Sequence, residues 1–289
     1  MQSFINGTIT GLTIAVLALA FTVVYLPTRI FHIALGGVYT VVPFIAWTAL
    51  RQHYPWPIAV LIGLSAGVTI SLSCELLNHS HLDRKRASSG AHLVSSLGIY
   101  IVITQITILV WGNESKALRT GLDENVIDGR ITLTRAQAIS TIFSLMILVT
   151  FYAWLRFSKL GLRFRALADN PVELSLRGYN LHLYRWLAFI LAGFLCSASA
   201  LLVSQDIGFD PHAGLAALLL AIVAVIIGGR GSFLGPVIGG LLIGIIRSEV
   251  IWFLSAKWQD TVTFLLLALF LFISPNGLCG HKRRLEAEA

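Results

Sequence analysis

The sequence predicts an all-α integral membrane protein, a bundle of about eight to nine transmembrane helices with one short helix on the cytoplasmic surface. Of its 289 residues, 56% are hydrophobic and only 12% are charged, whereas a soluble domain carries about 25% charged residues. The mean hydropathy is +0.80, and apolar runs recur from residue 9 to residue 275. One soluble core cannot bury so many runs of membrane-spanning length. The runs lack the period-two alternation of a barrel, so we expect helices.

Nine apolar runs are expected to cross the bilayer within one transmembrane domain that covers residues 1–289. No Lys or Arg precedes the first run, which is therefore predicted to be a permanent span and not a secretory signal. The seventh run is short and is either a half-span or a span with little tilt. The predicted spans are 9–27, 33–50, 57–77, 92–112, 136–156, 184–204, 214–229, 233–254 and 260–275.

The distribution of positive charge predicts the orientation of the chain. Fourteen of the 21 Lys and Arg residues share a side with the loop 157–183, six lie on the other side, and Arg247 lies within a span. Cytoplasmic loops carry the excess of Lys and Arg, so we expect an external N-terminus and a cytoplasmic C-terminus. This bias accounts for the net charge of +7, and no nucleic-acid partner is needed. The external loop 113–135 is expected to form a hairpin or a short helix.

The loop after the fifth span contains signals for both ends of a short helix. Asn170 is a good N-cap, Pro171 suits the first helical position, and Glu173 is placed to close a capping box. Gly178 suits a left-handed C-terminal position, with Arg177 beside the negative end of the helix dipole. So short a helix is marginal alone and needs a socket. The alternative is an interfacial helix that lies on lipid headgroups.

This segment resembles the cytoplasmic coupling loop of the branched-chain amino acid permease family of ABC importers. A glycine-rich turn at 228–240 and the terminal stretch 275–280 resemble the same family in the same order, so the resemblance spans nearly the whole chain. The matching loop positions are Gly161, Arg165, Ala166, Ala168, Asp169, Asn170, Pro171, Gly178 and Asn180.

The resemblance implies a permease subunit that forms a translocation path and is not itself catalytic. Its implied partners are a second permease subunit, two cytoplasmic ATPase subunits that bind ATP and Mg, an external solute-binding protein and the bilayer of the bacterial inner membrane. The implied cargo is an amino acid of the branched-chain type, with urea or a short amide as the alternative. The residues implied to couple to the ATPase are Arg165, Asp169, Asn170, Pro171, Glu173, Arg177 and Gly178.

Two other classes of protein fit less well. An uncoupled solute channel has no need of a capped docking helix. An intramembrane enzyme needs clustered His, Asp, Glu or Ser side chains, and here they are scattered along the spans. The glycine run is not a nucleotide loop, because the chain contains no GxxxxGK[ST] motif, and no cofactor is expected on this chain.

The segment 29–37 departs from the family pattern. His32 stands where the family usually has Asn, while Leu35 and Gly37 replace a His and a Glu. If this segment lines the path, the chain has lost polar groups there, which argues against a plain leucine-type substrate.

Four polar residues are candidates for the translocation path or for pairing between helices: His32, Gln105, Arg247 and Glu249. Ionisable groups in a membrane are costly and usually functional. Arg247 and Glu249 are two positions apart and do not face each other, so each is expected to pair with another helix or with a partner subunit. Gln105 either lines a polar path or bonds between helices, and the second is favoured.

The remaining candidates have simpler explanations. The GxxxG pairs, such as Gly240 and Gly244, allow close helix packing within the chain, although we also expect a partner permease to cover the glycine faces. His79, His81 and Asp83 are expected in a solvated cytoplasmic loop and not in a metal site. The three cysteines have no metal or disulfide spacing and are expected to be small buried hydrophobes.

Overall fold

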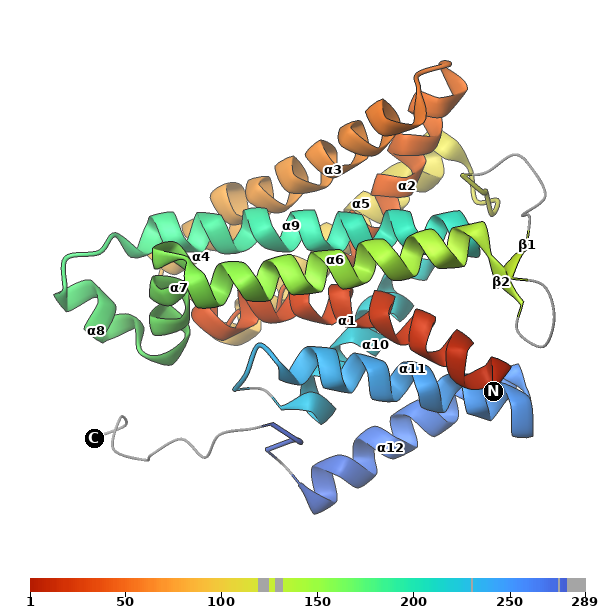
Figure 1. Cartoon of the computed structure of the whole chain (residues 1–289). Coiled ribbons are helices and arrows are strands. Elements are labelled where there is room, and N and C mark those ends of the chain that lie inside the picture. The colour runs from red at the N-terminus through yellow and green to blue at the C-terminus, as the bar shows by residue number, and fades with distance from the viewer. Residues whose placement is uncertain (119–124, 128–131, 230, 275, 280–289) are drawn as a thin grey trace.

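The computed structural model describes residues 1–118, 125–127, 132–229, 231–274 and 276–279. Figure 1 shows an elongated bundle of helices that run between two opposite ends. The strands within the described residues are two short ones, β1 (Asn125–Ile127) and β2 (Leu133–Thr134), which pair antiparallel. The loop 113–135 therefore contains the strand pair of a hairpin.

The nine predicted apolar helices are all present. Among the described residues, eight helical segments are long and apolar enough to cross a membrane, and the shorter helix α10 has 16 residues. The predicted first span begins too late, since its helix starts at residue 2. The nine helices are α1 (Gln2–Thr28), α2 (Leu35–Arg51), α3 (Trp56–Ser73), α5 (Ser89–Trp111), α6 (Arg135–Phe157), α9 (Leu181–Asp206), α10 (Ala213–Gly228), α11 (Gly235–Phe253) and α12 (Gln259–Ile273).

Five shorter helical elements complete the described chain. The π-helical turn η1 (Cys74–His79) continues α3 into α4 (Ser80–Arg84), so the third span is longer than predicted. The loop after α6 holds two helices where one was predicted, α7 (Lys159–Asp169) and α8 (Pro171–Leu176). The 3-10 turn η2 (Ala256–Trp258) precedes α12.

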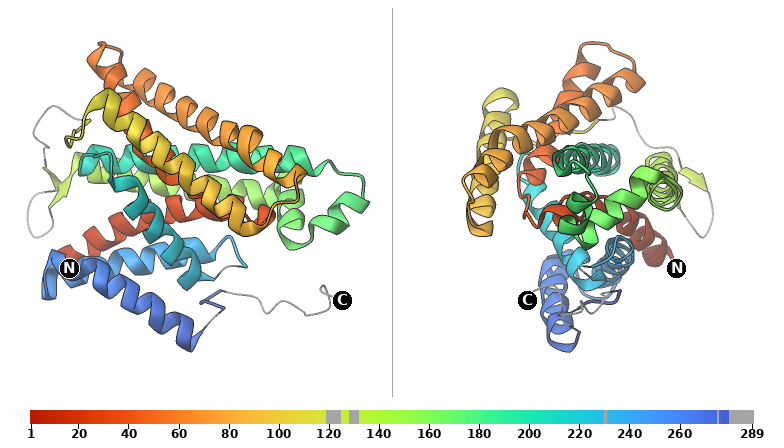
Figure 2. Two further views of the ribbon diagram at one scale, coloured as in Figure 1. Left: turned by 180° about the vertical axis from the view of Figure 1, so that it is seen from behind. Right: turned by 90° about the vertical axis from the view of Figure 1, so that its left-hand side faces the viewer.

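The helices form a buried centre and an apolar exterior. In the most apolar 18-residue stretch of α1, 83% of the residues are buried, whereas in Ala256–Ile273 only 6% are. The end-on view in Figure 2 shows α3 and α5 on one flank, α6 on the other, and α11 and α12 together. Large apolar side chains such as Leu109, Ile142 and Leu265 are exposed on this exterior. Water does not favour so much exposed apolar surface, which fits a lipid-facing bundle.

Small residues bring α1 and α11 into close contact. A Cβ atom on Gly7 would lie 2.7 Å from Ile245 Cα, and one on Gly240 would lie 2.7 Å from Ala15 Cα. Gly244 and Gly11 approach each other at the same seam. The glycine faces are therefore covered within the chain, and the expectation that a partner permease covers them is wrong. The glycines let the backbones of α1 and α11 touch, so these surfaces are occupied within the chain and are not open to a second subunit.

Helix α10 connects the two ends of the bundle although it is short. Near its start, Lys116 and Phe209 exchange two backbone hydrogen bonds of 2.8 Å. Near its end, the amides of Leu278 and Cys279 each donate a 2.9 Å hydrogen bond, to the carbonyls of Ile227 and Gly228 respectively. At 1.5 Å per residue α10 is about 24 Å long. It packs against α1, α2, α11 and α12. Because other helices surround it, its length does not have to match the thickness of the bilayer.

The connections sort into two groups, as the predicted topology requires. The hairpin end comprises the N-terminus and residues 52–55, 112–118, 132–134, 207–212 and 254–258, and the α8 end comprises residues 29–34, 85–88, 158–180, 229 and 231–234 (Figure 1). Arg230 of the glycine-rich turn, Pro275 and Gly280 of the terminal motif, and the basic residues Arg119, Arg130, Lys282, Arg283 and Arg284 lie outside the described residues.

Candidate functional site

Helix α8 begins and ends where the sequence predicts. The side chain of Asn170 accepts hydrogen bonds from the backbone amides of Val172 at 3.1 Å and Glu173 at 3.2 Å. Pro171 occupies the first helical position, where its missing N–H costs nothing. Gly178 follows the helix with φ of 81°, a conformation that favours glycine.

The predicted capping box does not form. Its donor would be the backbone N–H of Asn170, but that group already bonds to the carbonyl of Ala166 at 2.9 Å, because α7 ends directly before α8. Glu173 instead accepts a 2.6 Å hydrogen bond from Arg177, one turn further along α8. Both side chains are well exposed, so this pair contributes at most about 1 kcal/mol.

The α7–α8 corner is anchored to the bundle. Gly161 lies so close to α6 that a Cβ atom there would be 2.7 Å from Leu155 Cα. Phe164 is fully buried, with ring centroids 5.8 Å from Trp154 and 5.9 Å from Phe233. On α8, Leu174 packs into a small cluster with Leu167 and Tyr184. A six-residue helix is marginal in isolation, and these contacts hold it in place.

The outer face of α8 carries two exposed apolar side chains. Val172 is 64% exposed and Leu176 is 81% exposed. Asp169, Glu173 and Arg177 are exposed around them, and Arg165 on α7 is half-buried. Figure 1 shows α8 beyond the end of the bundle and not alongside its lipid-facing flank. An apolar pair ringed by charges of both signs suits a protein socket better than lipid headgroups.

A cavity of about 560 Å³ opens toward the hairpin end of the bundle. Residues from α1, α2, α6, α9, α10, α11 and α12 line it, and they combine hydroxyls and amides with aliphatic groups and two charged groups, Asp206 and Arg247. The lining includes Gln2, Asn6, Thr10, Thr13, Ile14, Leu17, Tyr39, Ser140, Ser199, Asp206, Leu220, Arg247, Ser248, Trp252 and Gln259.

Arg247 and Glu249 have partners on different helices. Arg247 donates hydrogen bonds to Asp260 at 2.7 Å and to Thr263 at 3.2 Å, both on α12. Glu249 accepts a 2.8 Å hydrogen bond from Ser3 on α1. Arg247 reaches the cavity and Glu249 is not part of its lining, so the two candidates separate into a cavity residue and a helix-pairing residue.

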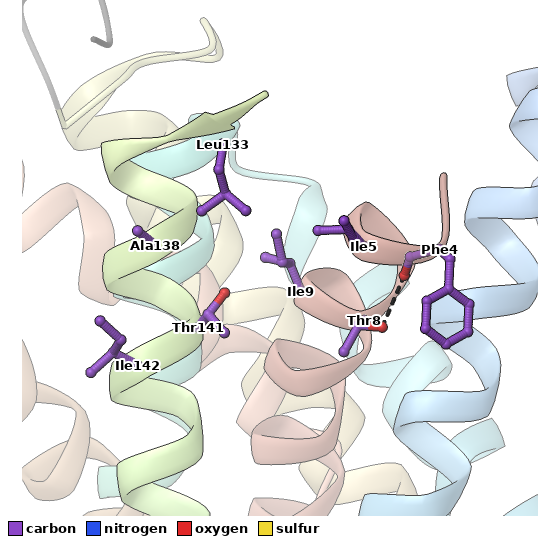
Figure 3. Close-up of a pocket in the computed structure, with 8 residues that line it drawn as sticks. All are labelled: Phe4, Ile5, Thr8, Ile9, Leu133, Ala138, Thr141 and Ile142. Carbon is purple, nitrogen blue, oxygen red and sulfur yellow. Dashed lines mark hydrogen bonds between the residues drawn. The ribbon is translucent and has the colours of Figure 1, made fainter. Parts of the chain in front are cut away.

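A second hollow of about 360 Å³ lies between α1 and α6 on the outside of the bundle (Figure 3). Its lining is aliphatic or aromatic apart from two threonines. Thr8 bonds to the Phe4 carbonyl at 2.9 Å and Thr141 to the Gln137 carbonyl at 2.7 Å. Both hydroxyls thus serve their own helices, and this hollow has no polar group to offer a solute.

The structure places His32 and Gln105 away from the cavity. His32 is fully buried at the α8 end, where its Nδ1 lies 3.1 Å from Nε2 of His79. The expectation that His79 lies in a solvated loop is wrong, because α3 continues as η1 and carries this side chain into the interior. His81, on α4, is exposed. Gln105 is exposed on the flank of α5.

Two cavity residues escaped the sequence analysis. Asp206 stands at the end of a span and reads as a simple helix break, and Gln259 follows the short polar turn before α12. The sequence feature that could have indicated them is their position, because both polar groups fall at the end of the bundle where the cavity opens.

A multi-helix apolar bundle with a cavity of mixed polar and aliphatic lining near one end, and an anchored short helix beyond the other, suits a membrane transport permease. The chain belongs to the family of permease components of branched-chain amino acid transport systems, whose model matches residues 3–273. It is a membrane subunit of an ABC importer.

Similar proteins agree with this assignment. The high-affinity branched-chain amino acid transport permease LivH of Escherichia coli is 25% identical over 97% of this chain and 96% of its own length. BraD of Pseudomonas aeruginosa, a permease described in the same terms, is also 25% identical with the same coverage. In solved structures, PsaBC from Streptococcus pneumoniae in complex with Fab matches with a TM-score of 0.51 at 14% identity, covering 94% of this chain and 91% of that one. At that identity the match supports the fold alone.

Proposed function

We propose that this permease imports amino acids with apolar side chains and is driven by ATPase subunits that dock on α8. The observation that carries the proposal is the anchored and capped α8, which exposes Val172 and Leu176 at the end opposite the cavity. The excess of Lys and Arg at the α8 end supports a cytoplasmic position for that end. The cavity then faces outward, in the plasma membrane of the cell.

The cavity supports the substrate class. An amino acid needs a positive partner for its carboxylate, a negative partner for its ammonium group and an apolar wall for its side chain. Arg247, Asp206 and the aliphatic residues Ile14, Leu17 and Leu220 bring these three chemistries to one lining, and a solute carboxylate would compete with Asp260 for Arg247. The relatives LivH and BraD are described as branched-chain amino acid permeases, in line with this class. Urea or a short amide needs no charged pair and is the less favoured cargo.

The proposed assembly contains a second permease subunit, two cytoplasmic ATPase subunits and an external solute-binding protein. This chain binds no cofactor in the proposal, and ATP and Mg act on the ATPase subunits. Arg165, Asp169, Asn170, Pro171, Glu173, Arg177 and Gly178 are proposed to form or support the ATPase contact. An uncoupled channel is the competing function, and it requires no contact at α8.

The test is to replace Glu173 with Pro in the assembled transporter. Proline removes the N–H that Asn170 caps at 3.2 Å, and it disfavours helical geometry at Val172. We expect normal insertion and normal docking of the solute-binding protein, with loss of both solute-stimulated ATP hydrolysis and uptake. The control Glu173→Gln keeps the N–H and loses only the exposed pair with Arg177. If Glu173→Pro hydrolyses ATP at the parental stimulated rate, α8 is not the coupling element.

A further inference from the structure

Three histidines from three separate segments form a continuous buried chain at the α8 end. Nδ1 of His32 lies 3.1 Å from Nε2 of His79, and Nδ1 of His79 lies 3.1 Å from Nδ1 of His92. His32 and His79 are fully buried and His92 is 3% exposed. His32 belongs to the α1–α2 connection, His79 to η1 and His92 to α5. We call these three residues the histidine chain.

The histidine chain continues to a group of charged residues that reaches the surface. Nε2 of His92 lies 3.1 Å from Oδ1 of Asp83 on α4. Arg185, near the start of α9, pairs with the other oxygen of Asp83 and donates a 3.2 Å hydrogen bond to buried Glu75 on η1. Arg185 Nε also lies 2.9 Å from Glu75, which makes a second ionic contact. The half-exposed carboxylate of Asp83 is thus the aqueous end of the histidine chain.

The contacts fix one proton on each neutral ring. A carboxylate oxygen only accepts, so Nε2 of His92 carries its proton toward Asp83 and leaves Nδ1 as an acceptor. His79 then donates from Nδ1 to His92, and His32 donates from Nδ1 to His79. The remaining nitrogen, Nε2 of His32, is buried and has no hydrogen-bond partner among the residues that the structure describes. As neutral rings, all three imidazoles then point their protons in one direction, toward Asp83, and Nε2 of His32 is the one ring nitrogen left without a partner in the described part of the chain.

The geometry does not suit a metal ion. His79 uses one nitrogen toward His32 and the other toward His92, so no single ion can sit between all three rings. Among the described residues, no group of His, Cys, Asp or Glu side chains is arranged to hold one. The ligand that a chain of imidazoles can take in this arrangement is a proton.

Among the described residues, Asp83 is the charged group in direct contact with the histidine chain, and Arg185 and Glu75 lie next to Asp83 on the side of His92. Glu75 and Asp83 favour an added proton and Arg185 opposes it, while both carboxylates are already engaged by the guanidinium. The opposite side is apolar, with the ring of Phe189 centred 4.9 Å from that of His32 and 5.5 Å from that of His79. Burial, followed by the neighbouring His79, holds the pKa of His32 well below its usual value.

We propose that the histidine chain is an acid-sensitive latch that joins the coupling region to the rest of the bundle. While it is neutral, it packs the α1–α2 connection, η1 and α5 together around the Glu75–Asp83–Arg185 group, which holds the start of α9. Helix α9 follows α8 directly, so this group lies on the route by which movement of α8 reaches the bundle. Uptake of one proton requires water to enter the buried chain, and the latch opens.

The direction of the pH effect follows from the burial. An opened chain binds a proton with the ordinary histidine pKa of about 6.5, and the closed chain binds it only at lower pH. Between those values the open state holds more protons, so the stability of the closed state falls as pH falls. The latch is fully closed above about pH 6.5 and opens as the pH on the α8 side decreases below that value.

The test measures solute transported per ATP hydrolysed in the complete reconstituted transporter at pH 7.5 and 6.0. A change of the ATPase rate with pH alters transport and hydrolysis together, so it leaves this ratio unchanged. An opened histidine goes from about one-tenth to about three-quarters protonated over this interval, which favours the opened latch by a further factor of about four, so we expect the parental ratio to fall by up to about fourfold. His79→Asn removes the middle ring that joins His32 to His92, and it is expected to make this fall clearly smaller than the parental one. His81→Asn, an exposed neighbour outside the chain, is the matched control and should keep the parental fall.

A constant parental ratio, or an unchanged fall in His79→Asn, would overturn the latch. If His79→Asn does not assemble, His92→Gln takes its place.

Hydrogen exchange of the parental transporter gives a readout that needs no ATPase activity. After correction for intrinsic rates, residues 29–34 and 181–188 should exchange faster at pH 6.0 than at pH 7.5, and equal protection at both would reject the latch. Because the latch rests on the proposed coupling at α8, the two fail differently: without coupling, solute stimulates no hydrolysis at either pH, while the exchange result still decides the latch.

Discussion

At the scale of single residues, Gly161 shows how the α7–α8 corner is fixed to α6. We predict that Gly161→Ala destabilises the protein by about 1–3 kcal/mol, the usual cost of overpacking. The added methyl would meet the backbone of α6 at Trp154 and Leu155, which cannot move aside as a flexible side chain can. Thermal unfolding of the purified chain in detergent gives the measurement.

The control for this substitution is Gly98→Ala on the exposed flank of α5. A Cβ atom there has nothing within 4 Å, and alanine is favoured over glycine in a helix by up to about 1 kcal/mol. Equal unfolding temperatures for the two variants would show that α6 and α7 do not pack as closely as described.

At the scale of elements, the exposed face of α8 allows the proposed docking to be tested without disturbing the fold. Leu176 is 81% exposed, so Leu176→Asp should leave the fold intact and weaken binding of the ATPase subunits at least about tenfold, as expected for an anchor at the centre of an interface. Leu183→Asp, at a 57% exposed site on the start of α9, is the control and should bind normally. Co-purification of the ATPase with each permease variant measures the effect, and equal recovery would place the socket elsewhere.

The long helices were predictable because lipid demands long apolar runs, and polar or helix-breaking residues interrupt them at Pro27, Asp206 and the glycine run at 228–231. Helix α7 was missed because Lys159, Arg163 and Arg165 make its sequence resemble a polar loop. It is an amphipathic helix that turns Phe164 and Leu167 inward.

The two candidate sites differ in how far sequence predicts them. The cap of α8 is local, so Asn170, Pro171 and Gly178 were read correctly from their spacing. The capping box failed because its donor was taken by Ala166, a contact that depends on α7. The histidine chain joins positions 32, 79 and 92 through tertiary packing, and nothing in the local sequence brings them together.

At the scale of the whole molecule, the orientation in the membrane is the central expectation. Glu114 at the hairpin end and Ser175 at the α8 end are both exposed. With the three native cysteines replaced by Ala, we predict that a membrane-impermeant maleimide added to intact cells labels Glu114→Cys and leaves Ser175→Cys unlabelled. Ser175→Cys should react only after the membrane is opened. The reverse pattern would invert the topology, and labelling of both from outside would show that they share a side.

The hydrogen bonds between the terminal motif and α10 have a consequence for the order in which the protein is made. The carbonyls of Ile227 and Gly228 are satisfied by the amides of Leu278 and Cys279, which are synthesised some fifty residues later. Until then the end of α10 carries carbonyl groups without these partners, a state that an apolar environment penalises. Helix α10 therefore reaches its final hydrogen bonding only after α11 and α12 have left the ribosome, and assembly of this bundle finishes with its last residues.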